Sequence, residues 1–206
     1  MVLADGSALT LNSDSVVQVR YDKAVRRIVL RRGAAFFQVV HNPERPFVVE
    51  AGDVSVTDIG TAFAVDRDGN HVAVTVSHGI VKVDDRGDRA DKQQYIRRDE
   101  QFVAASAGSR KVALTTNEVS RQLAWRKGLL VFEGRPLGPA ADEVSRYSKV
   151  PVVIDDPTLA RAEFVGVFHV GDSRGFANAA ARAFNGQVSL SDGVFHVSRQ
   201  ENSPSH

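Results

Sequence analysis

The stretch that decides the fold is Asp58-Ile59-Gly60-Thr61-Ala62-Phe63-Ala64-Val65, and a second stretch follows it, Val72-Ala73-Val74-Thr75-Val76-Ser77-His78-Gly79-Ile80-Val81-Lys82-Val83. Val, Thr, Ile and Phe dominate both stretches, and apolar side chains alternate along them as in half-buried β-strands. Gly60 and Gly79 stand where the chain has to bend. The two stretches therefore predict two strands and a tight turn into a third.

The same period-two pattern extends over residues 7–104, where turn residues separate short apolar runs. Asp68-Gly69-Asn70 lies between two alternating runs and is a strong hairpin signal. Strands spaced by roughly 8–12 residues predict an all-β domain over residues 1–104, either a sandwich or a solenoid-like stack. Alternation places four side chains toward its core: Phe37, Val39, Phe63 and Val65.

Residues 105–125 are expected to link two domains. Thr115 and Glu118 have the spacing of a capping box, which predicts a short helix over residues 116–125. Trp125 is the only tryptophan, and we expect it to pack at the junction between the two halves, because large aromatic side chains supply much of the area of small interfaces.

Residues 126–199 alternate strand and helix patterns in the order βαβ, then βαβ with a closing hairpin. The expected strands cover residues 129–132, 150–154, 164–170, 187–190 and 194–197, and the expected helices cover 136–147 and 173–184. This order predicts a small α+β domain with two helices on one face of one mixed sheet. Residues 200–206 are polar and predicted to be disordered.

The bulk composition is that of a globular protein. Of 206 residues, 43% are hydrophobic and 25% are charged. The net charge is +1, so the chain has no strong electrostatic field that would attract nucleic acid or an anionic membrane. Cysteine is absent, which excludes disulfides and cysteine nucleophiles. No apolar run is long enough to span a bilayer. The chain opens directly into strand-like sequence, so we expect it to be a fragment whose upstream part is missing.

No residue pattern predicts catalysis, a metal site or a cofactor. The six histidines lack metal-ligand spacing. His169 and His196 lie on predicted strands and could approach each other, although half-exposed strand residues are the favoured interpretation. Ser77-His78-Gly79 is a turn rather than a nucleophile elbow, and Asp155 and Asp156 are interpreted as a solvated pair. We therefore expect the chain not to be an enzyme.

Several motifs resemble the FecR-type regulators of bacterial iron uptake. The carriers are Leu3 to Asn12, Arg31 to Val39, His41 with Pro46-Phe47-Val48-Val49, and the Gly-Thr-x-Phe-x-Val strand with the Val-rich stretch after it. The second half resembles the short signalling domain of secretins and TonB-dependent transducers. Its carriers are residues 124–132, Arg146-Tyr147-Ser148 and Val165-Gly166-Val167-Phe168.

The resemblance implies a protein that grips an extracytoplasmic-function sigma factor through a cytoplasmic segment, crosses the membrane by one helix and exposes two periplasmic domains. We expect this chain to be the periplasmic part, without the segment that holds the sigma factor and without the helix. The resemblance also implies the partner, which is the periplasmic signalling domain of a TonB-dependent transducer loaded with an iron–siderophore or another ligand.

Docking between two small α+β domains could use sheet extension or a helix face. The candidate partner-binding residues are Phe164, Val165, Val167, Phe168, Val194, Phe195 and Val197. If the run from residue 164 is central in its sheet, the strand at 194–197 is the better edge, and the sequence leaves both open. A cluster of basic residues around one hairpin is interpreted as a solubilising edge or as a patch for an acidic partner: Lys23, Arg26, Arg27, Arg31 and Arg32.

The alternative function is an extracytoplasmic β module that binds a glycan. Such a module needs exposed aromatic platforms. Aromatic residues make up 7% of the chain and most of them fall at alternating core positions, so this alternative ranks below signal reception.

Overall fold

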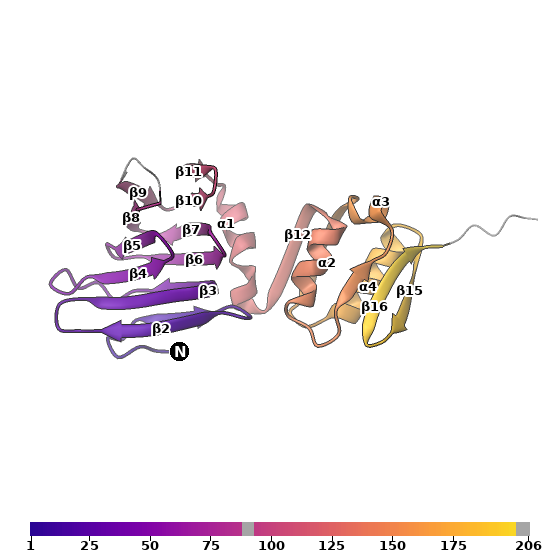
Figure 1. Cartoon of the computed structure of the whole chain (residues 1–206), viewed down its shortest axis with the longest axis horizontal. Helices are drawn as coiled ribbons and strands as arrows, with labels where there is room; N and C mark the ends of the chain where they lie inside the picture. Colours follow the sequence, from indigo (N-terminus) through magenta and orange to yellow (C-terminus); the bar gives the residue numbers. More distant parts are fainter. Residues whose placement is uncertain (88–92, 201–206) are drawn as a thin grey trace, which may run out of the picture. The chain divides into compact units, whose positions relative to one another are not determined.

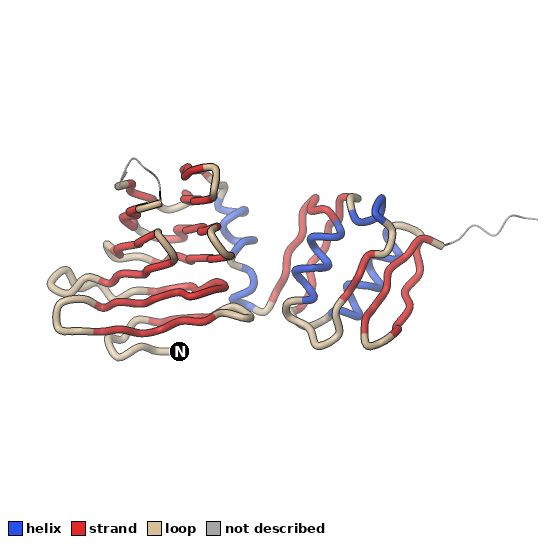
Figure 2. Tube along the Cα trace, in the orientation of Figure 1, coloured by secondary structure: helices blue, strands red, loops and turns tan. Residues whose placement is uncertain are grey.

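The computed structural model describes residues 1–87 and 93–200 (Figure 1). The predicted disorder of the tail falls on residues 201–206, which lie outside this range. The chain divides into two compact units, Met1–Arg126 and Lys127–His206. The chain is mainly β, as the sequence predicts (Figure 2).

The first unit is built from strands before any helix begins. Its strands are β1 (Ala8–Leu11), β2 (Val16–Tyr21), β3 (Arg26–Gln38), β4 (Phe47–Ala51), β5 (Val54–Asp58), β6 (Ala62–Asp68), β7 (His71–His78), β8 (Ile80–Asp85), β9 (Gln94–Arg97), β10 (Glu100–Ala105) and β11 (Gly108–Ala113). Within the described residues they join into one sheet. The long strand β3 divides this sheet, because its first half pairs with β2 and β4 and its second half with β1 and β6.

One hydrophobic core receives side chains from both halves of the sheet, which makes the unit sandwich-like. Phe37, Phe63 and Val65 are fully buried there, and Val39 packs against them from a half-buried position. The Phe37 and Phe63 rings stack with centroids 5.2 Å apart. The alternation read from the sequence is therefore confirmed for the strands that it singled out.

The turns follow the predicted glycine chemistry. Gly79 has φ +80°, and a Cβ there would lie 2.4 Å from the carbonyl oxygen of Gly60, so this close approach of two backbones requires glycine. The Asp68-Gly69-Asn70 hairpin joins β6 to β7 in antiparallel pairing.

The segment predicted as a linker belongs largely to the first unit. Residues 108–113 form β11 and pair with β10. The capping box of Thr115 and Glu118 is present and starts α1 (Thr116–Gln122), which is followed by the 3₁₀ turn η1 (Ala124–Lys127). Sequence reasoning missed β11 because its burial pattern is mostly exposed, so no apolar alternation marks it.

The second unit alternates strands and helices. Its elements are β12 (Leu129–Pro136), α2 (Leu137–Ser145), β13 (Val152–Ile154), α3 (Pro157–Ala160), β14 (Glu163–His169), α4 (Ser173–Ala183), β15 (Gly186–Ser191) and β16 (Val194–Arg199). Helix α3 was not predicted, although Asp156 caps it and Pro157 occupies its first turn.

The expected single mixed sheet is instead two small sheets. Strands β12 and β14 pair antiparallel, while β16 lies between β13 and β15, parallel to the first and antiparallel to the second. Helices α2 and α4 contact strands of both sheets and share one hydrophobic core with them. The difference arises because strand pairing is a long-range choice that local periodicity does not encode.

Candidate functional site

Strand β14 separates its side chains into a buried set and an exposed set. Phe164 is buried and Phe168 is half-buried, both within the core of the second unit. Val165 and Val167 point the other way, with 72% and 61% of their surface exposed. The candidate partner-binding residues on this strand therefore divide into two valines that a partner can reach and two phenylalanines that support them.

A cluster of aromatic rings holds β14 in place from its inner side. The rings of Phe164 and Phe168 stack with centroids 5.8 Å apart, and Phe176 of α4 meets Phe164 edge-on at 5.3 Å. Gly166 between the two phenylalanines makes room for this stack, because a Cβ there would lie 2.6 Å from the Phe168 ring. The two exposed valines thus stand on a well-packed support.

The outer face of the β12–β14 sheet is apolar at its centre and carries charged or polar residues around it, among them Glu133, Glu163 and His169. Val131 of β12 lies opposite Val167, and Glu133 lies opposite Val165. Leu129 and Val131 are half-buried on this face. Within the described residues β14 pairs with β12 alone, so its second edge has no strand partner. An apolar face beside an open edge is the kind of surface that extended-strand partners use.

Strand β16 differs from the sequence-based interpretation. Val194 is half-buried, while Phe195 and Val197 are buried in the core. Strand β16 is paired on both sides, by β13 and β15. Residues 194–197 are therefore not an edge strand, and of the two edges that the sequence leaves open, β14 is the one that the structure has among the described residues. A role of these three residues in partner binding stays a prediction.

Trp125 lies on η1 and is half-buried against a small cluster formed by Phe36, Ala64, Val119 and Leu123. The guanidinium of the next residue, Arg126, stacks 3.4 Å from the centroid of the Phe36 ring. These contacts fasten α1 and η1 to the first unit. The predicted packing of Trp125 between the two units stays a prediction.

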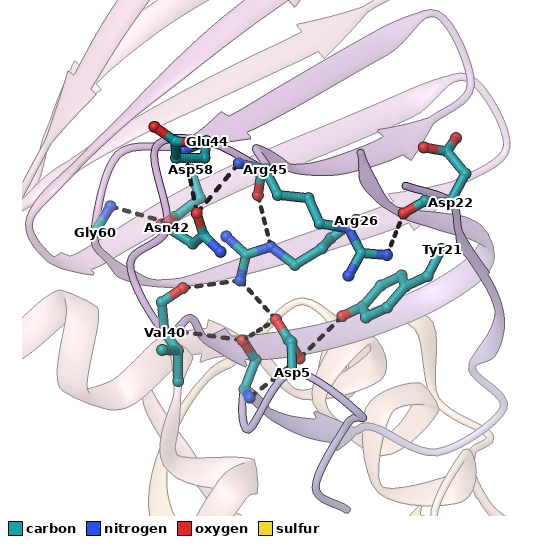
Figure 3. Close-up of polar contacts among 11 residues, drawn as sticks. Asp5, Tyr21, Asp22, Arg26, Val40, Asn42, Glu44, Arg45, Asp58 and Gly60 are labelled. Atoms are coloured by element: carbon teal, nitrogen blue, oxygen red, sulfur yellow. Dashed lines mark hydrogen bonds and ion pairs between the residues drawn. The ribbon is translucent and has the colours of Figure 1, made fainter. Parts of the chain in front are cut away.

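Figure 3 shows polar contacts that converge on Arg26 in the first unit. The side chain is buried, and its Nη1 donates to Asp5 Oδ2 at 2.6 Å and to the Val40 carbonyl oxygen at 2.8 Å. Its Nε donates to the Arg45 carbonyl oxygen at 2.8 Å. The Tyr21 hydroxyl donates to the other oxygen of Asp5 at 3.2 Å. The network joins the first residues of the chain to β2, β3 and the loop before β4.

This network shifts two pKa values. Burial by itself would raise the pKa of Asp5, but hydrogen bonds from Ser7, Arg26 and Tyr21 outweigh it and lower the pKa below its ordinary 3.8. Burial and the charge of Asp5 raise the pKa of Tyr21. These shifts favour the ionised form of Asp5 and the neutral form of Tyr21, which suits a structural clamp.

The basic cluster seen in the sequence is not one exposed patch. Arg26 is buried, Arg27 pairs with Glu50, and Arg31 and Arg32 donate to Gln18 and to the Asp14 carbonyl oxygen. Sequence reasoning missed the Arg26 clamp because Asp5 is 21 residues away and no local pattern connects the two.

The histidines behave as ordinary strand residues. His196 lies 3.0 Å from Asp155, between Nδ1 and Oδ1, whereas His169 lies on the other sheet of the second unit. Among residues 1–87 and 93–200, no group of three or more acidic or histidine side chains could hold a metal ion. Tyr95 is the one aromatic side chain among the large exposed hydrophobic residues of the described chain. Glycan binding stays an alternative prediction.

None of the helices in the described residues combines the length and the apolar character that crossing a membrane requires.

Comparisons with known proteins agree with the β-rich first unit. Residues 1–82 match the model of the FecR protein family, whereas the curated proteins give no match. Two crystal structures of a candidate anti-sigma factor from Parabacteroides distasonis, at 1.65 and 2.50 Å resolution, are similar to the chain with TM-scores of 0.77 and 0.76. Each is 21% identical and covers 98% of this chain, over 94% and 93% of its own length, which shows a common fold. Over residues 1–82, the chain is thus similar to the FecR family.

Proposed function

We propose that this chain is the signal-receiving part of a membrane-anchored sigma-factor regulator and that it works in the periplasm. Its second unit would dock the periplasmic signalling domain of a TonB-dependent transducer in iron–siderophore signalling. The sigma factor would be held by a cytoplasmic segment outside this sequence. The proposal starts from the similarity of residues 1–82 to the FecR family and adds a particular partner and compartment.

The observation that carries the proposal is the exposed outer face of the β12–β14 sheet. Val165 and Val167 leave most of their surface in solvent. The helices α2 and α4 share the core on the opposite face of this sheet and do not cover them. Exposed apolar side chains that stand together on a rigid strand mark interaction surfaces. The phenylalanine cluster behind β14 holds the strand in place, so this surface is pre-organised before a partner binds.

Docking on this face needs no chemistry beyond burial of apolar surface. A single small-domain face buries limited area, so we expect a dissociation constant on the order of micromolar. An affinity of that size also allows release, which a relay requires. Binding should involve the second unit and not the sandwich-like first unit.

Titration calorimetry tests this proposal with the whole chain and the purified periplasmic signalling domain of a TonB-dependent transducer from the same organism. Val167→Lys should weaken binding at least about tenfold, because it places a charge in the apolar contact. Val19→Lys is the matched control, since Val19 is 45% exposed on β2 of the first unit, and it should leave the affinity unchanged. Binding that is absent in the unaltered chain, or equally weakened by both variants, would contradict the proposal.

A further inference from the structure

Strand β14 has a sequence that reads almost the same in both directions. Glu163-Phe164-Val165-Gly166-Val167-Phe168-His169 is symmetric about Gly166, except that its two ends carry an acidic and a basic residue. Packing on α4 accounts for the inward-facing Phe164, Gly166 and Phe168. It does not account for the symmetry of the outward-facing positions, and neither does the pairing with β12, whose own sequence, Leu-Leu-Val-Phe-Glu-Gly-Arg-Pro, has no such symmetry.

A strand that is symmetric in this way can pair with itself. In an antiparallel pair related by a two-fold axis through Gly166, Val165 of one copy lies opposite Val167 of the other. Glu163 then lies opposite His169 at both ends. These residues share the outer face of the strand, where all four are exposed, so each contact is made between side chains on the same side of the sheet.

We propose that two copies of this chain associate through antiparallel pairing of their β14 strands, in the register that is two-fold symmetric about Gly166. The result is a four-stranded sheet in the order β12–β14–β14–β12. Main-chain hydrogen bonds between the two β14 strands occupy the edge that is open in each single copy. The contact is isologous, as expected for a two-fold dimer. This inference does not depend on the proposed function.

Three features of the strand favour a second copy as the occupant of this edge. The pairing places an acidic residue opposite a histidine at both ends and like apolar side chains at the centre. It joins the apolar centres of the two outer faces, so that Val131 and Val167 of one copy are followed by Val165 of the other, and the row ends at Glu133. Gly166 at the axis carries no side chain that could hold the strands apart.

Devices that block edge pairing are present elsewhere in the molecule. Strand β11, at the end of the sheet of the first unit, presents Arg110 and Lys111, which is how natural proteins discourage sheet-to-sheet association. Between Glu163 and His169, β14 carries neither charge nor proline. The contact is short, so we expect weak association, with a dissociation constant on the order of tens of micromolar or above.

Sedimentation velocity over a concentration series provides the first test. The unaltered chain should move from a 22.4 kDa monomer toward a dimer as its concentration rises. Val165→Lys should raise the dimer dissociation constant at least about tenfold, because two-fold symmetry introduces the charge twice. Leu190→Lys should leave it unchanged, since Leu190 is 57% exposed on β15 of the other sheet.

Cysteine pairing tests the register itself. The chain has no cysteine, so an introduced one is its only thiol. In the proposed register, Val165→Cys and Val167→Cys chains face each other when mixed, with Cβ atoms about 4.5–5.5 Å apart, whereas either variant alone places its thiols diagonally, about 7–8 Å apart. The mixture should form disulfide-linked dimers at least about tenfold faster than either variant alone.

Two results would overturn the inference. One is a chain that stays monomeric at all concentrations. If the monomeric chain also loses binding of a transducer domain through Val165→Lys, the open edge of β14 belongs to that domain and not to a second copy. The other is cross-linking in the mixture that is no faster than in the single variants. Both valines are exposed, so circular dichroism should show that the cysteine variants fold like the unaltered chain.

Discussion

The two units differ in which side chains they bury and which they expose. The first unit buries a charged pair, Arg26 with Asp5, whose side chains keep 3% and 9% of their surface exposed. The second unit leaves Val165 and Val167 in solvent on a strand with an open edge. Burying a charge is tolerated only where partners are complete, whereas exposing apolar surface is retained where something is to bind. The contrast suggests that the first unit acts as a scaffold and that the second unit carries the surface for a partner.

Removing one member of the buried pair should produce the largest effect. Asp5→Ala leaves the Arg26 guanidinium buried without its carboxylate, and the free energy of unfolding of the first unit should fall by roughly 3–5 kcal/mol. Urea unfolding followed by the fluorescence of Trp125, which packs on this unit, measures the loss. Glu44→Ala, at an exposed loop position, is the control and should change stability by less than about 0.5 kcal/mol. Equal effects of both would show that the clamp contributes nothing.

A core truncation should destabilise the first unit by a similar amount without touching the second. Phe63 is fully buried and stacks on Phe37, so Phe63→Ala should cost roughly 3–5 kcal/mol. The thermal transition seen through Trp125 should shift down, while amide exchange in β14 stays as before. A joint shift in both readouts would mean that the two units unfold as one.

The pH dependence of the same clamp should be smaller. The pKa of Asp5 is lowered in the folded chain, so its stabilisation is present above the unfolded value of about 3.8 and is lost as pH falls through the folded value. Other carboxylates, among them Glu100, share this sign. The stability of Asp5→Asn should therefore fall less steeply below pH 4 than that of the unaltered chain, measured by urea unfolding at each pH. Parallel curves would contradict the role of Asp5.

The exposed valines should matter least for stability. Val165→Ala removes a side chain that is 72% exposed, so the free energy of unfolding of the second unit should change by no more than about 0.5 kcal/mol. Phe164→Ala on the same strand is the matched comparison and should cost roughly 3–5 kcal/mol, because it opens the aromatic cluster. Amide exchange in β14 and β16 measures both. If the two substitutions cost the same, the exposed surface is part of the fold and not reserved for a partner.

The sequence by itself determined the elements and the faces that they bury. Alternation placed Phe63 and Val65 in the core, glycines fixed the turns at Gly60 and Gly79, and Thr115 with Glu118 started α1 at the predicted residue. These features depend on side-chain period, backbone conformation and capping, which act over a few residues. Helix α3 had a local signal in Asp156-Pro157 that the sequence interpretation did not use.

Only the tertiary structure decided which strands are edges and which charges are buried. Strands β14 and β16 are both apolar in sequence, but among residues 1–87 and 93–200 β16 is paired on both sides and β14 on one, and nothing local distinguishes them. In the sequence, Arg26 belongs to a basic cluster that could be exposed. In the structure its side chain is buried and donates hydrogen bonds to Asp5 and to the Val40 and Arg45 carbonyl oxygens. Pairing and ion contacts join residues distant in sequence, and their free energy depends on what else is packed around them.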